Sequence, residues 1–125
     1  MEQEEKDLLL KDLSGRLPYG LLVQISDYTT PQRVEAISDD LEVRVNNIFV
    51  YSLLYECKPY LRSISSMTEE EQKEYHKTFR AEAYGNGYVY VESVHSFDWL
   101  NKHNFDYRGL IEKGLALEAP DDMYN

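Results

Sequence analysis

Cysteine, clustered basic residues and long apolar runs are scarce in this chain. Cys57 is the only cysteine among 125 residues, which excludes an internal disulfide and agrees with a reducing compartment. The 13 Lys and Arg are outnumbered by 23 Asp and Glu, for a net charge of −10, and no two basic residues are adjacent. Binding to a phosphate backbone needs clustered Lys and Arg, so we expect no direct binding of DNA or RNA. The apolar runs are too short to cross a membrane.

Targeting signals and ligand-binding motifs are also missing. The chain begins MEQEEKDLLLKDL, which is acidic where a secretory signal is basic, so we expect a cytoplasmic protein. The two glycines that flank Asn86 are too close together for a phosphate-binding loop, and no lysine follows them. We therefore expect no cofactor.

Tyrosine, by contrast, is abundant, with 11 residues. Tyrosine is favoured both at half-buried sheet positions and in protein interfaces, and composition alone does not choose between these interpretations. The acidity is spread evenly along the chain and also has two interpretations. It serves solubility, or it imitates nucleic acid toward a basic partner.

The first part of the chain is predicted to form one helix and two strands. Residues 2–13 read as an amphipathic helix, with leucines on one side and Asp12 among the charged residues on the opposite side. Alternating apolar residues predict strands at residues 20–28 and, with a weaker pattern, at residues 32–38.

A hairpin is predicted around the two asparagines at 46–47, which can supply the left-handed conformations of a two-residue turn. That turn would place Val43 opposite Val50, on an all-aliphatic face. Residues 53–57 resemble an edge strand, and Pro59 is expected to end its pairing because proline cannot donate a backbone hydrogen bond.

The next predicted element is a surface helix. Thr68 and Glu71 fit the capping box that starts a helix, which we expect to continue to about Arg80. Residues 85–87 then form a turn, and alternating Tyr and Val predict a strand at residues 88–92.

Residues 97–120 hold the only tryptophan and are expected to close the core. Ser96 is predicted to cap a helix that carries Trp99, and Asp106 to cap a second helix over residues 107–113. We expect Trp99 to be largely buried. The chain is predicted to end with a short strand at 115–118 and a loose tail at 120–125.

These elements predict a single α+β domain over residues 1–125. Strands dominate the first half and helices flank the last strand, which favours an antiparallel sheet of four or five strands. The N-terminal helix and the helices of residues 97–113 are expected to pack on one face of that sheet.

The densest group of metal-ligand residue types is His95, Asp98, His103 and Asp106. Two histidines that share an ion on a helix lie four residues apart, whereas these lie eight apart. We therefore expect no metal site and no catalytic residue, and we place His103 against Trp99. The lone cysteine has no nearby histidine to activate it.

The candidate protein-binding residues are aromatic or acidic: Phe49, Tyr51, Tyr88, Tyr90, Glu69, Glu70 and Glu74. If helices cover only one face of the sheet, the four aromatic residues form an exposed patch on the other face. The alternative is that a helix covers them. The three glutamates begin a helix and are either a solvated surface or a docking site for a basic partner.

Three blocks carry a resemblance to a known family: LPYG at 17–20, KPYLRSISSMTEEE at 58–71 and HNFDYRGLIEKGLALEAP at 103–120. On these blocks the chain resembles a family of small uncharacterised proteins from gut anaerobes and their phages or prophages. Residues 24–56 match it only as a strand-rich region. The resemblance implies a mobile-element setting and an accessory role, and it carries over no catalytic or ligand residue.

Three functional hypotheses follow. The first is a non-enzymatic cytoplasmic protein, associated with a phage or other mobile element, that binds a protein partner. The second is an acidic inhibitor of an enzyme that handles nucleic acid in host defence. The third is a small hydrolase or metal enzyme that uses His95, Asp98 or His103.

Overall fold

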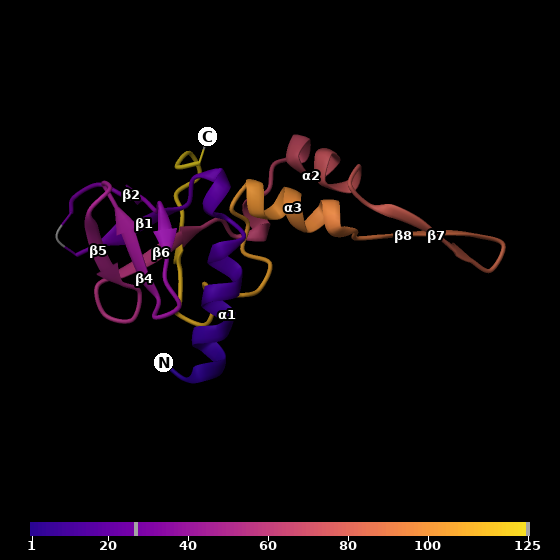
Figure 1. Cartoon of the computed structure of the whole chain (residues 1–125). Helices are drawn as coiled ribbons and strands as arrows, with labels where there is room; N and C mark the ends of the chain where they lie inside the picture. Colours follow the sequence, from indigo (N-terminus) through magenta and orange to yellow (C-terminus); the bar gives the residue numbers. More distant parts are fainter. Residues whose placement is uncertain (27, 125) are drawn as a thin grey trace.

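The protein consists of a small body of helices and short sheets from which one hairpin projects (Figure 1). The computed structural model describes residues 1–26 and 28–124. Helices and short sheets alternate along the chain, which confirms the α+β class. The predicted single antiparallel sheet is wrong, because the strands of the described residues divide among three sheets.

The largest sheet has four strands in the order β2-β1-β6-β9. Their bounds are β1 (Leu22–Ile25), β2 (Gln32–Arg33), β6 (Cys57–Leu61) and β9 (Leu117–Glu118). Strand β1 pairs antiparallel with β2 and β6, whereas β9 pairs parallel with β6. The sheet therefore joins the two ends of the chain.

Pro59 lies inside the central strand β6 and does not end pairing, contrary to our prediction. It pairs with Val23 of β1, and the ladder with β9 begins only at Tyr60. A proline is tolerated here because β9 is too short to reach the position that lacks an N–H group.

A second sheet has three strands, β3 (Ala36–Ile37), β4 (Glu42–Val45) and β5 (Phe49–Ser52). Asn46 and Asn47 both adopt positive φ, of 51° and 71°, as predicted for the turn. The loop is one residue longer than predicted, so Val43 pairs with Tyr51 instead of Val50. A slip of one residue moves every side chain to the other face, and Val50 is consequently exposed.

The main core lies between helix α1 (Gln3–Ser14) and the first two sheets. Leu9 and Leu13 of α1 are buried against the inward residues of the strands, among them Val23 and Val43. The short 3-10 helix η1 (Leu17–Tyr19) connects α1 to β1. The predicted boundaries of α1 are confirmed to within one residue.

Asp12 is buried, although the helical pattern placed it on the solvent side of α1. Its carboxylate accepts hydrogen bonds from Arg16 at 2.8 and 3.0 Å and from Arg108 at 2.8 Å. Arg16 also donates to the carbonyl of Phe105 at 2.8 Å. The segment that contains Arg108 covers the charged side of the helix, so that α1 is buried on two sides.

A second, smaller core lies beside the first, at α2 (Glu69–His76) and α3 (Val94–Lys102), and the 3-10 helix η2 (Ile64–Ser66) precedes α2. The buried residues of this core are Met67, Leu100 and Phe105. Helix α3 therefore packs with α2, rather than beside α1 on one sheet face as we predicted. Helix α2 ends at His76, four residues before the predicted end.

Trp99 is half-buried at the edge of this second core, less buried than predicted. Its ring lies 4.3 Å from His103 and 5.6 Å from Phe105, measured between ring centroids. The predicted contact between Trp99 and His103 is confirmed.

The C-terminal segment contains fewer regular elements than predicted. Asp106 accepts hydrogen bonds from the backbone N–H groups of Leu110 and Ile111, but the residues that follow it form turns and no helix. The predicted loose tail is wrong at Tyr124, whose hydroxyl donates to the carbonyl of Tyr60 at 2.7 Å and accepts from the N–H of Leu22 at 2.9 Å. Asn125 lies outside the described residues.

The third sheet is the projecting hairpin, which we call the arm (residues 80–91). It consists of β7 (Arg80–Tyr84) and β8 (Gly87–Val91), and it extends away from α2 and α3 into solvent (Figure 1). Strand β8 was predicted almost to the residue, whereas β7 was missed. No helix among the described residues has the length and apolar character needed to span a membrane.

Candidate interaction site

The arm is held together by pairing between its own two strands. Tyr84 pairs with Gly87 across a two-residue turn, and pairing continues back to Arg80 and Val91. Gly85 has a φ of 58°, the left-handed conformation that this kind of hairpin turn requires at its first position. The tight turn keeps the two strands in register along the whole arm.

The two faces of the arm differ in chemistry. In an antiparallel ladder, directly opposed residues share a face. One face therefore presents Ala81 beside Tyr90 and Ala83 beside Tyr88, and it carries no charge. The opposite face carries the ion pair of Arg80 and Glu82, at 2.7 Å.

The aromatic residues of the arm are open to solvent. Tyr84, Tyr88 and Tyr90 are 73%, 72% and 70% exposed. Every residue from 80 to 90 is exposed, so no other described part of the chain covers the arm. Contiguous exposed apolar surface in a soluble protein usually marks a site of contact.

The base of the arm is fixed to the body by a network of hydroxyl groups. The Ser93 hydroxyl donates to the carbonyl of Thr78 at 2.7 Å and accepts from the N–H of His95, which caps α3. Thr78 Oγ1 donates to Ser96 Oγ at 2.8 Å. Ser93, and not Ser96 as predicted, is the N-cap of α3. The arm therefore projects in a set direction.

The four aromatic candidates from the sequence lie in two separate places, so they form neither a single exposed patch nor a single set covered by a helix. Tyr88 and Tyr90 lie in the arm, whereas Phe49 and Tyr51 lie in β5 of the body. Phe49 is 48% exposed. The Tyr51 ring packs edge-on against Tyr28 at 5.8 Å, so Tyr51 belongs largely to the body. In the arm, two of the candidates, Tyr88 and Tyr90, are exposed together on one face.

The acidic candidates lie on α2. Glu69, Glu70 and Glu74 are exposed. Their neighbour Glu71 is turned inward, where both its oxygens accept hydrogen bonds from Arg62 at 2.7 Å. These hydrogen bonds lower the pKa of Glu71 to about 2.

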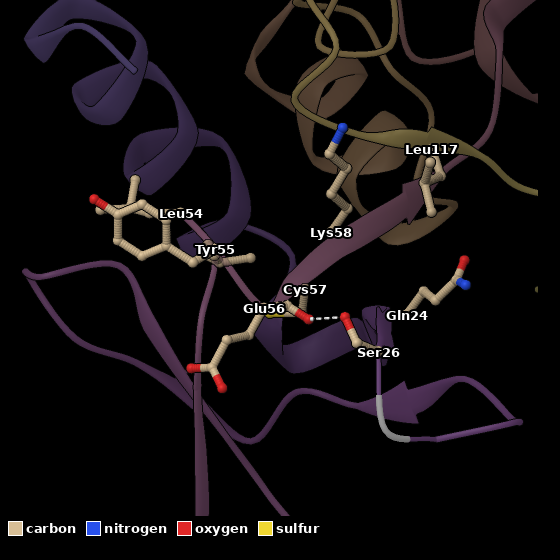
Figure 2. Close-up of a pocket in the computed structure, with 9 residues that line it drawn as sticks. Gln24, Ser26, Leu54, Tyr55, Glu56, Cys57, Lys58 and Leu117 are labelled. Carbon is tan, nitrogen blue, oxygen red and sulfur yellow. Dashed lines mark hydrogen bonds between the residues drawn. The ribbon is translucent and has the colours of Figure 1, made fainter.

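A pocket of about 340 Å³ lies beside β1 and β6, next to Cys57 (Figure 2). Figure 2 shows Ser26 joined by a hydrogen bond to Glu56 at its rim. Burial raises the pKa of the Cys57 thiol to about 12, so this sulfur remains protonated at neutral pH. No histidine is among the described residues that line the pocket, and the arrangement contains no activated nucleophile.

The polar residues around α3 do not converge on one point. His95 and Asp98 are exposed, whereas burial beside Trp99 lowers the pKa of His103. Asp106 is engaged with backbone N–H groups. Across residues 1–26 and 28–124, no group of three or more His, Cys, Asp or Glu side chains is placed to hold a metal ion.

Comparison with protein-family models, with curated proteins and with solved structures finds no match to this chain.

Proposed function

We propose that the protein is a non-enzymatic, cytoplasmic binding protein that uses the arm to hold a protein partner. The observation that carries this proposal is the exposure of three tyrosines on a hairpin that the rest of the described chain leaves uncovered. In line with the resemblance noted above, we propose an accessory role associated with a phage or other mobile element.

The uncharged face of the arm has the shape and chemistry of a contact surface. Tyr88 and Tyr90 stand along one strand, and the small side chains of Ala81 and Ala83 lie beside them on the other. The alanine side chains are small, so the tyrosine rings provide most of the contact area on this face. Tyrosine supplies a large contact area at small entropic cost, and it is enriched among the residues that dominate binding energy.

The second candidate function is the acidic inhibitor. It is supported by Glu69, Glu70 and Glu74, which are exposed on α2, the helix that precedes the arm in the chain (Figure 1). A partner held by these carboxylates would bind less tightly as salt rises, whereas a partner held by the tyrosines would be far less sensitive to salt.

The proposal is tested by affinity purification from host cells followed by mass spectrometry. Three baits are compared: the wild type, the double variant Tyr88→Ala/Tyr90→Ala, and Tyr55→Ala as a matched control. Tyr55 is 87% exposed but lies in the body, before β6. We expect a partner that the wild type and Tyr55→Ala retain and that the double variant loses. Identical retention by all three baits would refute the role of the arm.

A further inference from the structure

We infer that a second copy of this chain pairs with the outer edge of β8. Two arms would then lie antiparallel across a two-fold axis at Val89 and form one four-stranded sheet, in the order β7-β8-β8-β7. This inference rests on the proposed function only in taking the arm as a contact surface. In this arrangement a second copy of the chain binds the edge of β8. The face with Tyr88 and Tyr90 remains available to a different protein partner.

The outer edge of β8 has free backbone groups at two alternate residues. Opposed residues in an antiparallel ladder alternate between pairs that exchange hydrogen bonds and pairs that do not. Tyr84 and Gly87 close the turn and exchange bonds, so Glu82 and Val89 do as well. The N–H and C=O groups of Tyr88 and Tyr90 consequently point outward, where no described strand pairs with them.

The sequence of β8 is symmetric about this edge. Tyr88-Val89-Tyr90 reads the same in both directions, so a two-fold axis at Val89 places each Tyr88 opposite the Tyr90 of the other copy. These are the residues whose backbone groups are free, and they can exchange hydrogen bonds in pairs. Aromatic side chains opposed across strands also stabilise a sheet. Backbone and side chains thus select the same register.

Charge favours this edge over the edge of β7. Arg80 and Glu82 are the only charged residues of the arm, and they cancel within a chain whose net charge is −10. Two copies of this acidic chain therefore repel each other less at the arm than at other parts of the surface. A two-fold axis at Glu82, the equivalent position on β7, would place Glu82 opposite itself, which is unfavourable. A two-fold interface uses the same edge of both copies, so pairing through β8 closes at two copies.

The register also brings the tip of each arm to the base of the other. Pairing about Val89 sets Gly85 and Asn86 of one copy level with Ser93 and Glu92 of the other. A hollow of about 400 Å³ lies there, lined by Arg80, Glu92, Ser93, Val94 and Phe97. The two bodies would lie at opposite ends of the shared sheet. A two-stranded hairpin is marginal alone in water, and pairing would place each arm in a sheet of four strands, above the three that independent stability needs.

A charge swap at the axis tests the inference by sedimentation equilibrium. We expect the wild type to form dimers, and Val89→Lys and Val89→Glu each to be monomeric because like charges meet at the axis. An equimolar mixture of the two variants should form dimers again. Ala81→Lys is the matched control and should remain dimeric. Residue 81 lies on the outer strand β7, where it is far from residue 81 of the other copy. A monomeric wild type, or variants that dimerise unchanged, would overturn the inference.

A disulfide at the axis provides a second measurement. A pair of residues that does not exchange hydrogen bonds has Cα atoms about 4.5 Å apart, within the range that a disulfide spans. Val89→Cys should cross-link the two copies on mild oxidation, whereas Ala83→Cys should not. The native Cys57 is buried and should not contribute. Equal cross-linking of both variants would contradict the register.

These results are separable from the purification experiment. Loss of a partner on Tyr88→Ala/Tyr90→Ala with a monomeric wild type would leave the proposed function standing and the dimer refuted. A dimer that binds no other protein would support the inferred pairing and refute the proposed function. A strand of a different protein found on the edge of β8 would also refute the second copy as its occupant.

Discussion

Asp12 and Arg62 show how charged side chains are kept inside this small protein. Removing a charge from water is costly unless hydrogen bonds replace those of the solvent. Asp12 receives bonds from two arginines, and Arg62 donates to both oxygens of Glu71 while its guanidinium lies 4.1 Å from the centroid of Phe105. Each buried charge has a partner of opposite sign. Replacing one partner should therefore lower the free energy of unfolding, because the other charge stays buried without compensation.

The pair of Glu71 and Arg62 predicts a dependence of stability on pH. The pKa of Glu71 is lowered from 4.5 to about 2 in the folded protein, chiefly by its hydrogen bonds from Arg62. The stabilisation is therefore complete above about pH 4.5 and is lost as the pH falls toward 2. Glu71→Gln should lower the free energy of unfolding by roughly 2 kcal/mol at pH 7, because a charged hydrogen-bond acceptor is lost.

Urea unfolding across this pH range measures the effect. The difference between wild type and Glu71→Gln should shrink as the pH falls from 4.5 to 2. Glu70→Gln, an exposed change on the same helix, should show no comparable difference. A difference for Glu71→Gln that stays constant with pH would contradict the assignment.

Trp99 provides a second test at the level of one side chain. Its ring packs against Tyr75, His103 and Phe105 and is half-buried. Trp99→Ala should lower the free energy of unfolding by roughly 3 kcal/mol, the lower end of the range for large core aromatics. Unfolding is followed by circular dichroism because this is the only tryptophan. The exposed control Tyr55→Ala should change stability by less than about 0.5 kcal/mol. A wild-type fluorescence maximum typical of fully solvated indole would disprove the placement.

At the scale of elements, local chemistry was predictable from the sequence and long-range pairing was not. The capping box of Thr68 and Glu71 and the left-handed Asn46 and Asn47 follow from neighbours in the chain, and the structure contains them. The role of Pro59 depends on a strand from the other end of the chain. No local sequence pattern around Pro59 indicates that β9 pairs with this strand. The sequence therefore predicts that Pro59 lies at the edge of a sheet.

The candidate site was predictable in part for the same reason. Tyr88 and Tyr90 follow from the alternation in β8, but β7 was missed because RAEAY continues the helical composition before it. The two-residue turn at 85–86 was the available signal, since such a turn implies a partner strand on its other side. Reading that turn as a hairpin would have added Tyr84 to the aromatic candidates.

The arm should contribute little to the stability of the body. Arg80 and Val91 are direct partners about 5.5 Å apart, so a short Gly-Ser linker can replace residues 81–90. We expect the thermal midpoint of the monomer to shift by less than about 3 °C, which corresponds to under 1 kcal/mol in a domain of this size. Differential scanning calorimetry measures this shift. Ser93→Ala, which removes the cap of α3, is the contrasting variant and should lower the midpoint further. A large loss on removal of the arm would mean that the body depends on it.

For the molecule as a whole, the net charge predicts that it does not bind nucleic acids. With 23 acidic and 13 basic side chains, its field repels phosphate groups at long range. Fluorescence anisotropy with labelled duplex DNA and single-stranded RNA should show no binding at physiological salt. Tight retention that weakens steeply as salt rises would refute this expectation.

The contact of Tyr124 with Leu22 also predicts an order of folding. These residues are 102 positions apart in the chain, and Arg16 meets the carbonyl of Phe105 across 89 positions. Closing such long loops loses much entropy before any contact compensates for it, whereas a hairpin forms in roughly 1–10 μs. The arm can therefore form and re-form many times while the body is still unfolded. We expect the slow step to be the meeting of the first and last segments, so a covalent link between them should speed folding more than any change within a hairpin.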